Sequence, residues 1–129
     1  MGWNDAALAA AGLIGSGVAA MHGVLVQRLM VRPIKALSAG ESGLSGTVLR
    51  LVPLLLHFST ICWFLGGLAL ITASCCLGGE ARLATGMFVG AFYLYGALGN
   101  FWATRGRHPG WMLMAAALVL IAFGLGGSG

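Results

Sequence analysis

Two histidines inside apolar runs are the residues of this chain best suited to chemistry. His57 lies in the stretch LLHFSTICWF, residues 55–64, closely followed by Ser59 and Thr60, and His22 lies five residues before Gln27 in an earlier apolar run. Imidazole, hydroxyl and amide groups can hydrogen-bond one another, ligate a metal or relay protons. Which of these they do depends on the elements that position them.

The composition predicts that these elements are membrane-spanning helices. Of the 129 residues, 59% are hydrophobic and 8% are charged, whereas soluble domains carry about 25% charged residues. A helix needs about 20 mostly apolar residues to cross a bilayer. We predict a single transmembrane domain, residues 1–129, that folds as an all-α, integral membrane four-helix bundle of antiparallel up-down topology. Its predicted spans are approximately 6–31, 48–77, 83–103 and 109–127.

The distribution of charge predicts an orientation. Six of the seven Lys and Arg residues lie in or beside the loops that join the first span to the second and the third to the fourth, and Arg82 alone lies at the opposite end. Cytoplasmic loops carry an excess of basic residues, so both basic loops are expected in the cytoplasm and both termini outside. So few basic residues do not make the stripe that binds nucleic acid.

Three polar side chains are expected at one depth. His22, His57 and Asn100 each lie five to seven residues inward from an arginine at the cytoplasmic end of their span, which is about 7 to 10 Å along a helix. Polar groups in hydrocarbon are stabilised when they face inward and pair. We therefore expect a buried polar cluster. Its predicted members are His22, Gln27, His57, Ser59, Thr60 and Asn100.

Three functions for this cluster stay open. The favoured one is an interhelical hydrogen-bond clamp that fixes the register of the helices. Alternatively, His22 and His57 on adjacent helices ligate a metal or the iron of haem b. The third is a proton or substrate path, as in a small transporter or channel. It is disfavoured because no Asp or Glu lies within a span and such paths usually use one.

The loop RGRHPGW, residues 105–111, is the predicted contact with lipid headgroups. Arg105, Arg107 and His108 precede a helix N-terminus, where positive charge and the helix dipole both favour a phosphate. The alternative is that they only orient and anchor the chain. The sequence carries no HExxH, GxSxG, P-loop or CxxC motif. We expect no catalytic residues and no enzyme activity.

Small residues and prolines predict how the helices pack and where they end. A stripe of small residues in the first span and the pair Gly86 and Gly90 in the third predict close helix contacts within the bundle, or a homo-oligomer interface as the alternative. Pro33 is expected to end the first helix, so that residues 33–46 form a loop, and Pro53 to bend the second span. The small-residue stripe of the first span consists of Ala11, Gly15, Ala19 and Gly23. Whether the closing GGSG is native stays open.

Three segments carry a resemblance to a family. MHGVLVQRLMVRPI (21–34), RLVPLLLHFSTICWF (50–64) and RGRHPGW (105–111) resemble a group of small uncharacterised bacterial four-span inner-membrane proteins. That group has a span-one histidine before a basic segment ending in proline, then Arg, His, Ser and Trp in order in span two, and the loop RGRHPxW. The resemblance covers most of the chain and implies a multi-pass protein of the bacterial inner membrane, but no activity. The residues that it relates are His22, Arg50, His57, Trp63 and His108.

Together these features favour a small non-catalytic membrane protein. Because almost no chain is left for domains outside the bilayer, the lipid-facing helices are its main contact surface. This suits an accessory, stabilising or assembly subunit of a larger membrane complex, with membrane lipids and other integral membrane subunits as partners. A haem- or metal-binding redox module using His22 and His57 is one alternative, and a small transporter or channel is the other.

Overall fold

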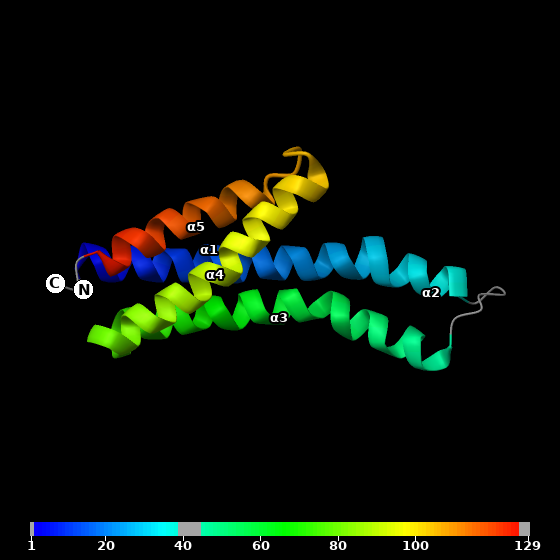
Figure 1. Cartoon of the computed structure of the whole chain (residues 1–129), viewed down its shortest axis with the longest axis horizontal. Coiled ribbons are helices and arrows are strands. Elements are labelled where there is room, and N and C mark those ends of the chain that lie inside the picture. The colour runs from blue at the N-terminus through cyan, green and yellow to red at the C-terminus, as the bar shows by residue number, and fades with distance from the viewer. Residues whose placement is uncertain (1, 39–44, 127–129) are drawn as a thin grey trace.

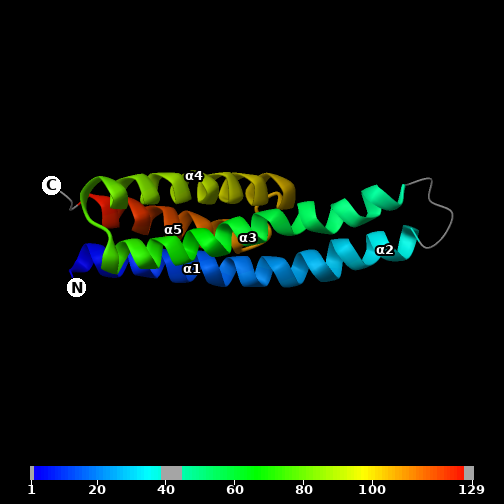
Figure 2. The same ribbon diagram turned by 90° about the horizontal axis from the view of Figure 1, so that it is seen from below.

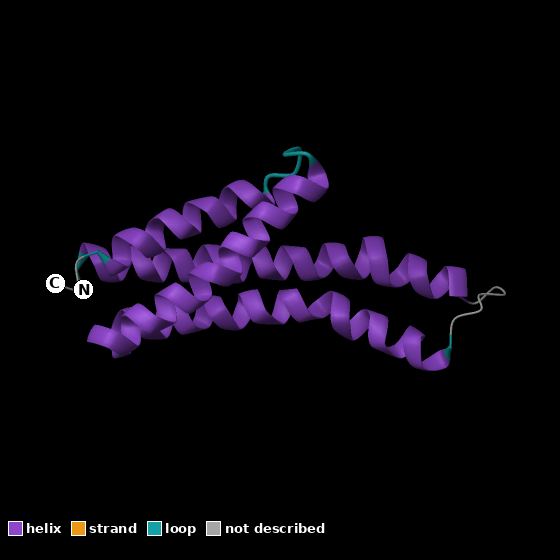
Figure 3. Ribbon diagram, viewed as in Figure 1, coloured by secondary structure: helices purple, strands orange, loops and turns teal. Residues whose placement is uncertain are grey.

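The computed structural model describes residues 2–38 and 45–126, and these residues are helical throughout apart from short turns (Figure 3). The first α-helix, a π-helix and a short α-helix follow one another without a break and form one long helix. The described residues therefore form four long helices. This confirms the predicted all-α four-helix bundle. The elements are α1 (Trp3–Val26), the π-helix η1 (Gln27–Val31), α2 (Arg32–Ser38), α3 (Gly46–Cys76), α4 (Gly79–Thr104) and α5 (Gly110–Leu125).

The helices run up and down and pack around a common centre. α1 packs mainly on α3 and α5, and α4 packs on α5 and α3, with each long helix antiparallel to the next (Figures 1 and 2). α1 begins and α5 ends at the same end of the bundle, which we call the closed end (Figure 1). The opposite end of the four-helix part, at the turn between α4 and α5, is called the open end.

Two of the helices are long and apolar enough to cross a membrane. They are the continuous helix Trp3–Ser38, with 36 residues, and α3, with 31 residues. α5 is an apolar helix of 16 residues. The ends of α3, α4 and α5 lie within a few residues of the predicted boundaries, but the end of the first helix does not.

The prediction that Pro33 ends the first helix is wrong. The helix continues through Pro33 to Ser38, and the rest of the predicted loop, residues 39–44, lies outside the described residues, as do residues 127–129 of the closing GGSG. The π-helix just before the proline explains the difference. Arg32 N–H donates to the carbonyl of Gln27, five residues back. Such a turn is wider than an α turn and makes room for the proline ring, which otherwise clashes with the preceding turn.

Beyond the open end, a pair of helices projects without α4 and α5. This two-helix arm consists of η1, α2 and residues 46–55 of α3, and both views show that it extends past the α4–α5 turn (Figures 1 and 2). Pro53 lies inside α3 within the arm, and the ribbon of α3 curves along its first half (Figure 1). The arm carries four of the seven basic residues: Arg28, Arg32, Lys35 and Arg50.

Glycines set the closest helix contacts. A Cβ built on Gly67 of α3 would lie 2.5 Å from the carbonyl oxygen of Gly12 of α1, so the two backbones touch at this level. The phenol of Tyr93 occupies the place of a side chain at Gly15. Ala11, Gly15 and Ala19 are buried inside the chain, so the small-residue stripe makes internal contacts, as predicted.

Candidate functional site

Two hydrogen bonds join the first long helix to α3. His22 Nε2 lies 3.2 Å from Ser59 Oγ, and His57 Nε2 lies 3.1 Å from Gln27 Oε1. All four side chains are half-buried. Each bond joins one residue of the first helix to one of α3. The bonded residues lie five positions apart on the first helix and two positions apart on α3. The predicted cluster is therefore two cross-helix pairs, each with one histidine.

Trp63 extends this contact toward α4. Its indole is 5% exposed, and its ring centroid lies 4.7 Å from that of His22 at an interplanar angle of 53°. A Cβ on Gly96 of α4 would lie 2.6 Å from the indole, so α4 packs directly on it. Tyr93 donates from its hydroxyl to the Trp63 carbonyl at 3.3 Å. Trp63 thus lies between α1 and α4.

The other predicted members of the cluster have local or no partners. Asn100 Nδ2 donates to the carbonyl of Gly96 at 2.8 Å, one turn back in its own helix, and does not bond to either pair. Thr60 lies against Gly23 of α1, and its hydroxyl is buried without a hydrogen-bond partner. The structure therefore unites His22 with Ser59 and His57 with Gln27, and leaves these two outside.

The α4–α5 turn holds the three residues predicted to meet lipid headgroups. Arg105 ends α4 with a left-handed backbone (φ 51°), and Gly106 follows at φ 73°. His108 Nδ1 accepts a hydrogen bond from Gly110 N–H at 3.1 Å. Arg105, Arg107 and His108 are all exposed. Their contact with lipid phosphate stays a prediction.

A cavity of about 560 Å³ lies between the first helix and this turn. Trp63 forms part of its wall, and the remaining apolar lining comes from α1, η1 and α5. The polar side chains that line it are His22, Asn100, Thr104 and His108. His22 and Asn100, two members of the predicted polar cluster, therefore line the same cavity. They form no hydrogen bond with each other; each bonds to another residue.

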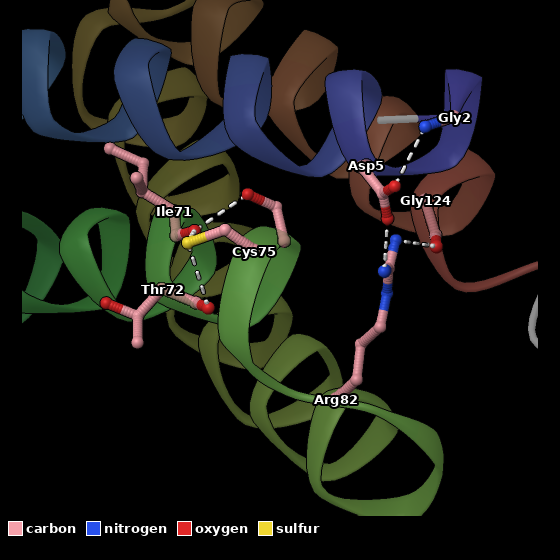
Figure 4. Close-up of polar contacts among 8 residues, drawn as sticks. Gly2, Asp5, Ile71, Thr72, Cys75, Arg82 and Gly124 are labelled. Atoms are coloured by element: carbon pink, nitrogen blue, oxygen red, sulfur yellow. Dashed lines mark hydrogen bonds and ion pairs between the residues drawn. The ribbon is translucent and has the colours of Figure 1, made fainter.

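The closed end carries an ion pair that sequence reasoning missed. Arg82, at the start of α4, donates to Asp5 Oδ1 and, at 3.0 Å, to the carbonyl of Gly124 in α5 (Figure 4). Gly2 N–H donates to Asp5 Oδ2 at 2.9 Å. The Arg82 guanidinium and the Gly2 N–H hold the pKa of Asp5 below its usual range. The sequence could have predicted this pair. In an up-down bundle the start of the first helix, with Asp5, and the start of the third, with Arg82, lie at the same end.

The histidines' partners bear on metal chemistry. Within residues 2–38 and 45–126, no group of three or more His, Cys, Asp or Glu residues could hold a metal ion. The Nε2 atoms of His22 and His57 already bond to Ser59 and Gln27. Ligation of a metal through these two atoms would break both cross-helix bonds. The chain matches none of the protein families, curated proteins or solved structures with which it was compared.

Proposed function

We propose that this chain is a non-catalytic four-span protein of a bacterial inner membrane that serves as an accessory or assembly subunit of a larger membrane complex. Two helices of sufficient length and apolarity support insertion, and the resemblance of its three segments to small inner-membrane proteins supports the location. The proposed orientation puts the arm and the α4–α5 turn in the cytoplasmic half, because six of the seven basic residues lie there.

The two-helix arm is the observation that carries the proposal. Neither α4 nor α5 extends along it (Figures 1 and 2), so its outer faces carry large exposed apolar side chains. Contiguous exposed apolar surface marks a site of interaction with another protein or a membrane. Four such side chains on the arm are Leu37, Val48, Leu51 and Leu54.

The length of the arm favours a protein partner over lipid alone. The continuous helix Trp3–Ser38 is about 54 Å long at 1.5 Å per residue, whereas the hydrocarbon layer is about 30 Å thick. Part of the arm therefore extends beyond the acyl chains, where Leu37, 76% exposed, needs another apolar surface to cover it. The basic residues beside it suit a partner with acidic side chains, or anionic lipid headgroups.

The two cross-helix pairs support a structural role for the histidines in this subunit. An interhelical hydrogen bond in a membrane bundle contributes about 0.6 kcal/mol on average, and the pairs fix the rotation of α1 against α3. A fixed rotation keeps the apolar faces of the arm in a constant orientation for the partner.

Site-specific photo-cross-linking in the native membrane tests the proposal. A photoreactive amino acid is placed at Leu54 in the arm, and in a matched control at Phe88 on α4; each side chain is 68% exposed. We expect a discrete heavier band at position 54, identified by mass spectrometry as another membrane protein, and lipid adducts at position 88. Lipid adducts alone at both positions would remove the accessory-subunit proposal.

A further inference from the structure

The cavity at the open end has the size and lining of a ligand site. Its volume of about 560 Å³ falls within the range of about 300–1,000 Å³ that is usual for small-molecule pockets. Such pockets are mostly apolar and have a few convergent polar groups that orient the ligand. Here the polar groups come from three places in the chain: α1, the last two turns of α4, and the α4–α5 turn.

Several of these polar groups keep hydrogen-bonding capacity after their internal bonds are made. His108 Nδ1 accepts from Gly110 N–H, so in the neutral ring the proton is on Nε2, which is then a donor. Asn100 uses Nδ2 for the Gly96 carbonyl, which leaves its Oδ1 as an acceptor. His22 uses Nε2 for Ser59, which leaves Nδ1. No hydrogen bond within the described residues uses these three atoms.

The charge of the lining restricts the occupant. Among residues 2–38 and 45–126, no Asp, Glu, Lys or Arg lines the cavity. An ionised group without a partner in an apolar site costs several kcal/mol. A plain acyl chain or an apolar partner helix would fill the volume but would make no hydrogen bond to the free donor and acceptor atoms of the lining. An uncharged molecule with an apolar body and an oxygen-bearing head matches the apolar wall and can pair with the free polar atoms of the lining.

We propose that this cavity binds an uncharged amphiphile, a lipid-like molecule with an apolar body and a hydroxyl or carbonyl head. The head accepts from His108 Nε2, and a hydroxyl head also donates to Asn100 Oδ1. The body lies along the apolar face of α1, against Trp63 and Leu113. The cavity includes Leu29 and Met30 of η1, at the base of the arm, but not Leu37, Val48, Leu51 or Leu54. The ligand proposal and the subunit proposal therefore rest on different side chains and are tested separately.

A photoreactive long-chain alcohol tests the site in the full-length protein in phospholipid vesicles. Cross-linked peptides are mapped by mass spectrometry, and labelling at Leu25 and Leu113 in the cavity is compared with labelling at the exposed Phe88. We expect cavity labelling to saturate and to be displaced by the unlabelled alcohol. The photoreactive alkane and carboxylate of equal length should label the cavity about tenfold less at equal concentration, as for the loss of about 1.4 kcal/mol of binding.

Two substitutions with a matched control complete the test. Gly17 lines the cavity and Gly99 does not, and a Cβ at either meets nothing within 4 Å, so Gly17→Phe fills the cavity while Gly99→Phe only adds exposed surface. We expect Gly17→Phe to reduce saturable labelling about tenfold and Gly99→Phe to leave it unchanged. Asn100→Leu removes one hydrogen bond to the head and should weaken binding by about two- to tenfold.

Three outcomes would overturn the proposal. Equal, non-saturable labelling of the cavity and Phe88 would mean that only bulk acyl chains enter. Equal labelling by the alcohol and the alkane would mean that the head is not recognised. Cross-linking from the cavity to a second protein, with no saturable alcohol site, would mean that a partner helix fills it. Competition in the unsubstituted protein decides the result even where Gly17→Phe does not fold, as judged by circular dichroism.

Discussion

Replacing Gly67 by alanine tests the close backbone contact between α1 and α3. The added methyl would lie 2.5 Å from the Gly12 carbonyl oxygen and 2.9 Å from the backbone nitrogen of Ser16, whereas carbon–oxygen contacts are about 3.3 Å or longer. The backbone atoms of α1 cannot rotate aside, so α1 and α3 must separate by roughly 1 Å. A gap of that size removes about a quarter to a half of the van der Waals energy of each contact between the two helices. Overpacking of this kind costs about 1–3 kcal/mol.

The helix propensity of alanine opposes this cost, so the experiment needs a matched substitution. Gly99→Ala lies in the interior of α4, where the methyl meets nothing within 4 Å, and gains the same propensity of about 1 kcal/mol. We expect Gly67→Ala to unfold with a free energy about 1–3 kcal/mol lower than Gly99→Ala. Reversible unfolding by SDS in mixed micelles, followed by circular dichroism, measures the difference. Equal free energies would show that α1 and α3 do not touch at Gly67.

Three further predictions concern hydrogen bonds and charge. In a double-mutant cycle with His22→Ala and Ser59→Ala, the same unfolding assay should give a coupling free energy of about 0.6 to 1.7 kcal/mol; additive effects would contradict the 3.2 Å bond. Tyr93→Phe should lower the free energy of unfolding by about 1 kcal/mol, because it removes the buried hydroxyl and its 3.3 Å hydrogen bond to the Trp63 carbonyl. The matched variant Tyr95→Phe, at a side chain that is 78% exposed, should have no effect. Asp5 lies just before the predicted first span, and its pKa is lowered by the Arg82 guanidinium. Its ion pair therefore stabilises the fold above the carboxyl pKa of the unfolded chain and is lost as pH falls through the lower folded pKa. Asp5→Asn should remove this acid-dependent part of the unfolding curve, and an unchanged pH profile would refute the pairing.

Composition and periodicity were enough to predict the long helices, but not where the first helix ends, which depends on local backbone geometry at Pro33. The number of long helices and three of the four sets of boundaries follow from apolar run length and from the turns around Gly78 and Gly106. Proline disfavours helix in the residue before it, and this rule predicts that the first helix ends at Pro33. The rule failed because η1 supplies a wider turn at that point, and no pattern in the sequence marks a π-helix.

The polar residues show what depth along a helix does and does not determine. Counting from the arginines placed His22, His57 and Asn100 at a similar level, and His22 and Asn100 do line one cavity. Partner choice depends on the rotation of each helix about its axis, which counting does not give. His57 therefore bonds to Gln27 and not to His22, and Asn100 bonds to its own helix.

The glycines explain why the cavity lies at the open end. Toward the closed end, a Cβ on Gly86 would lie 2.7 Å from Leu125 and one on Gly124 would lie 3.0 Å from Leu8, so small residues there allow close packing. At Trp63 a large indole takes the space between α1 and α4. α5 lies close to α1 at the closed end and farther from it toward the α4–α5 turn (Figure 1). Gly17, which lines the cavity, has no neighbour within 4 Å of a Cβ. The change from glycine contacts to a tryptophan spacer thus makes the bundle taper. The same feature that tightens one end leaves room for a ligand at the other.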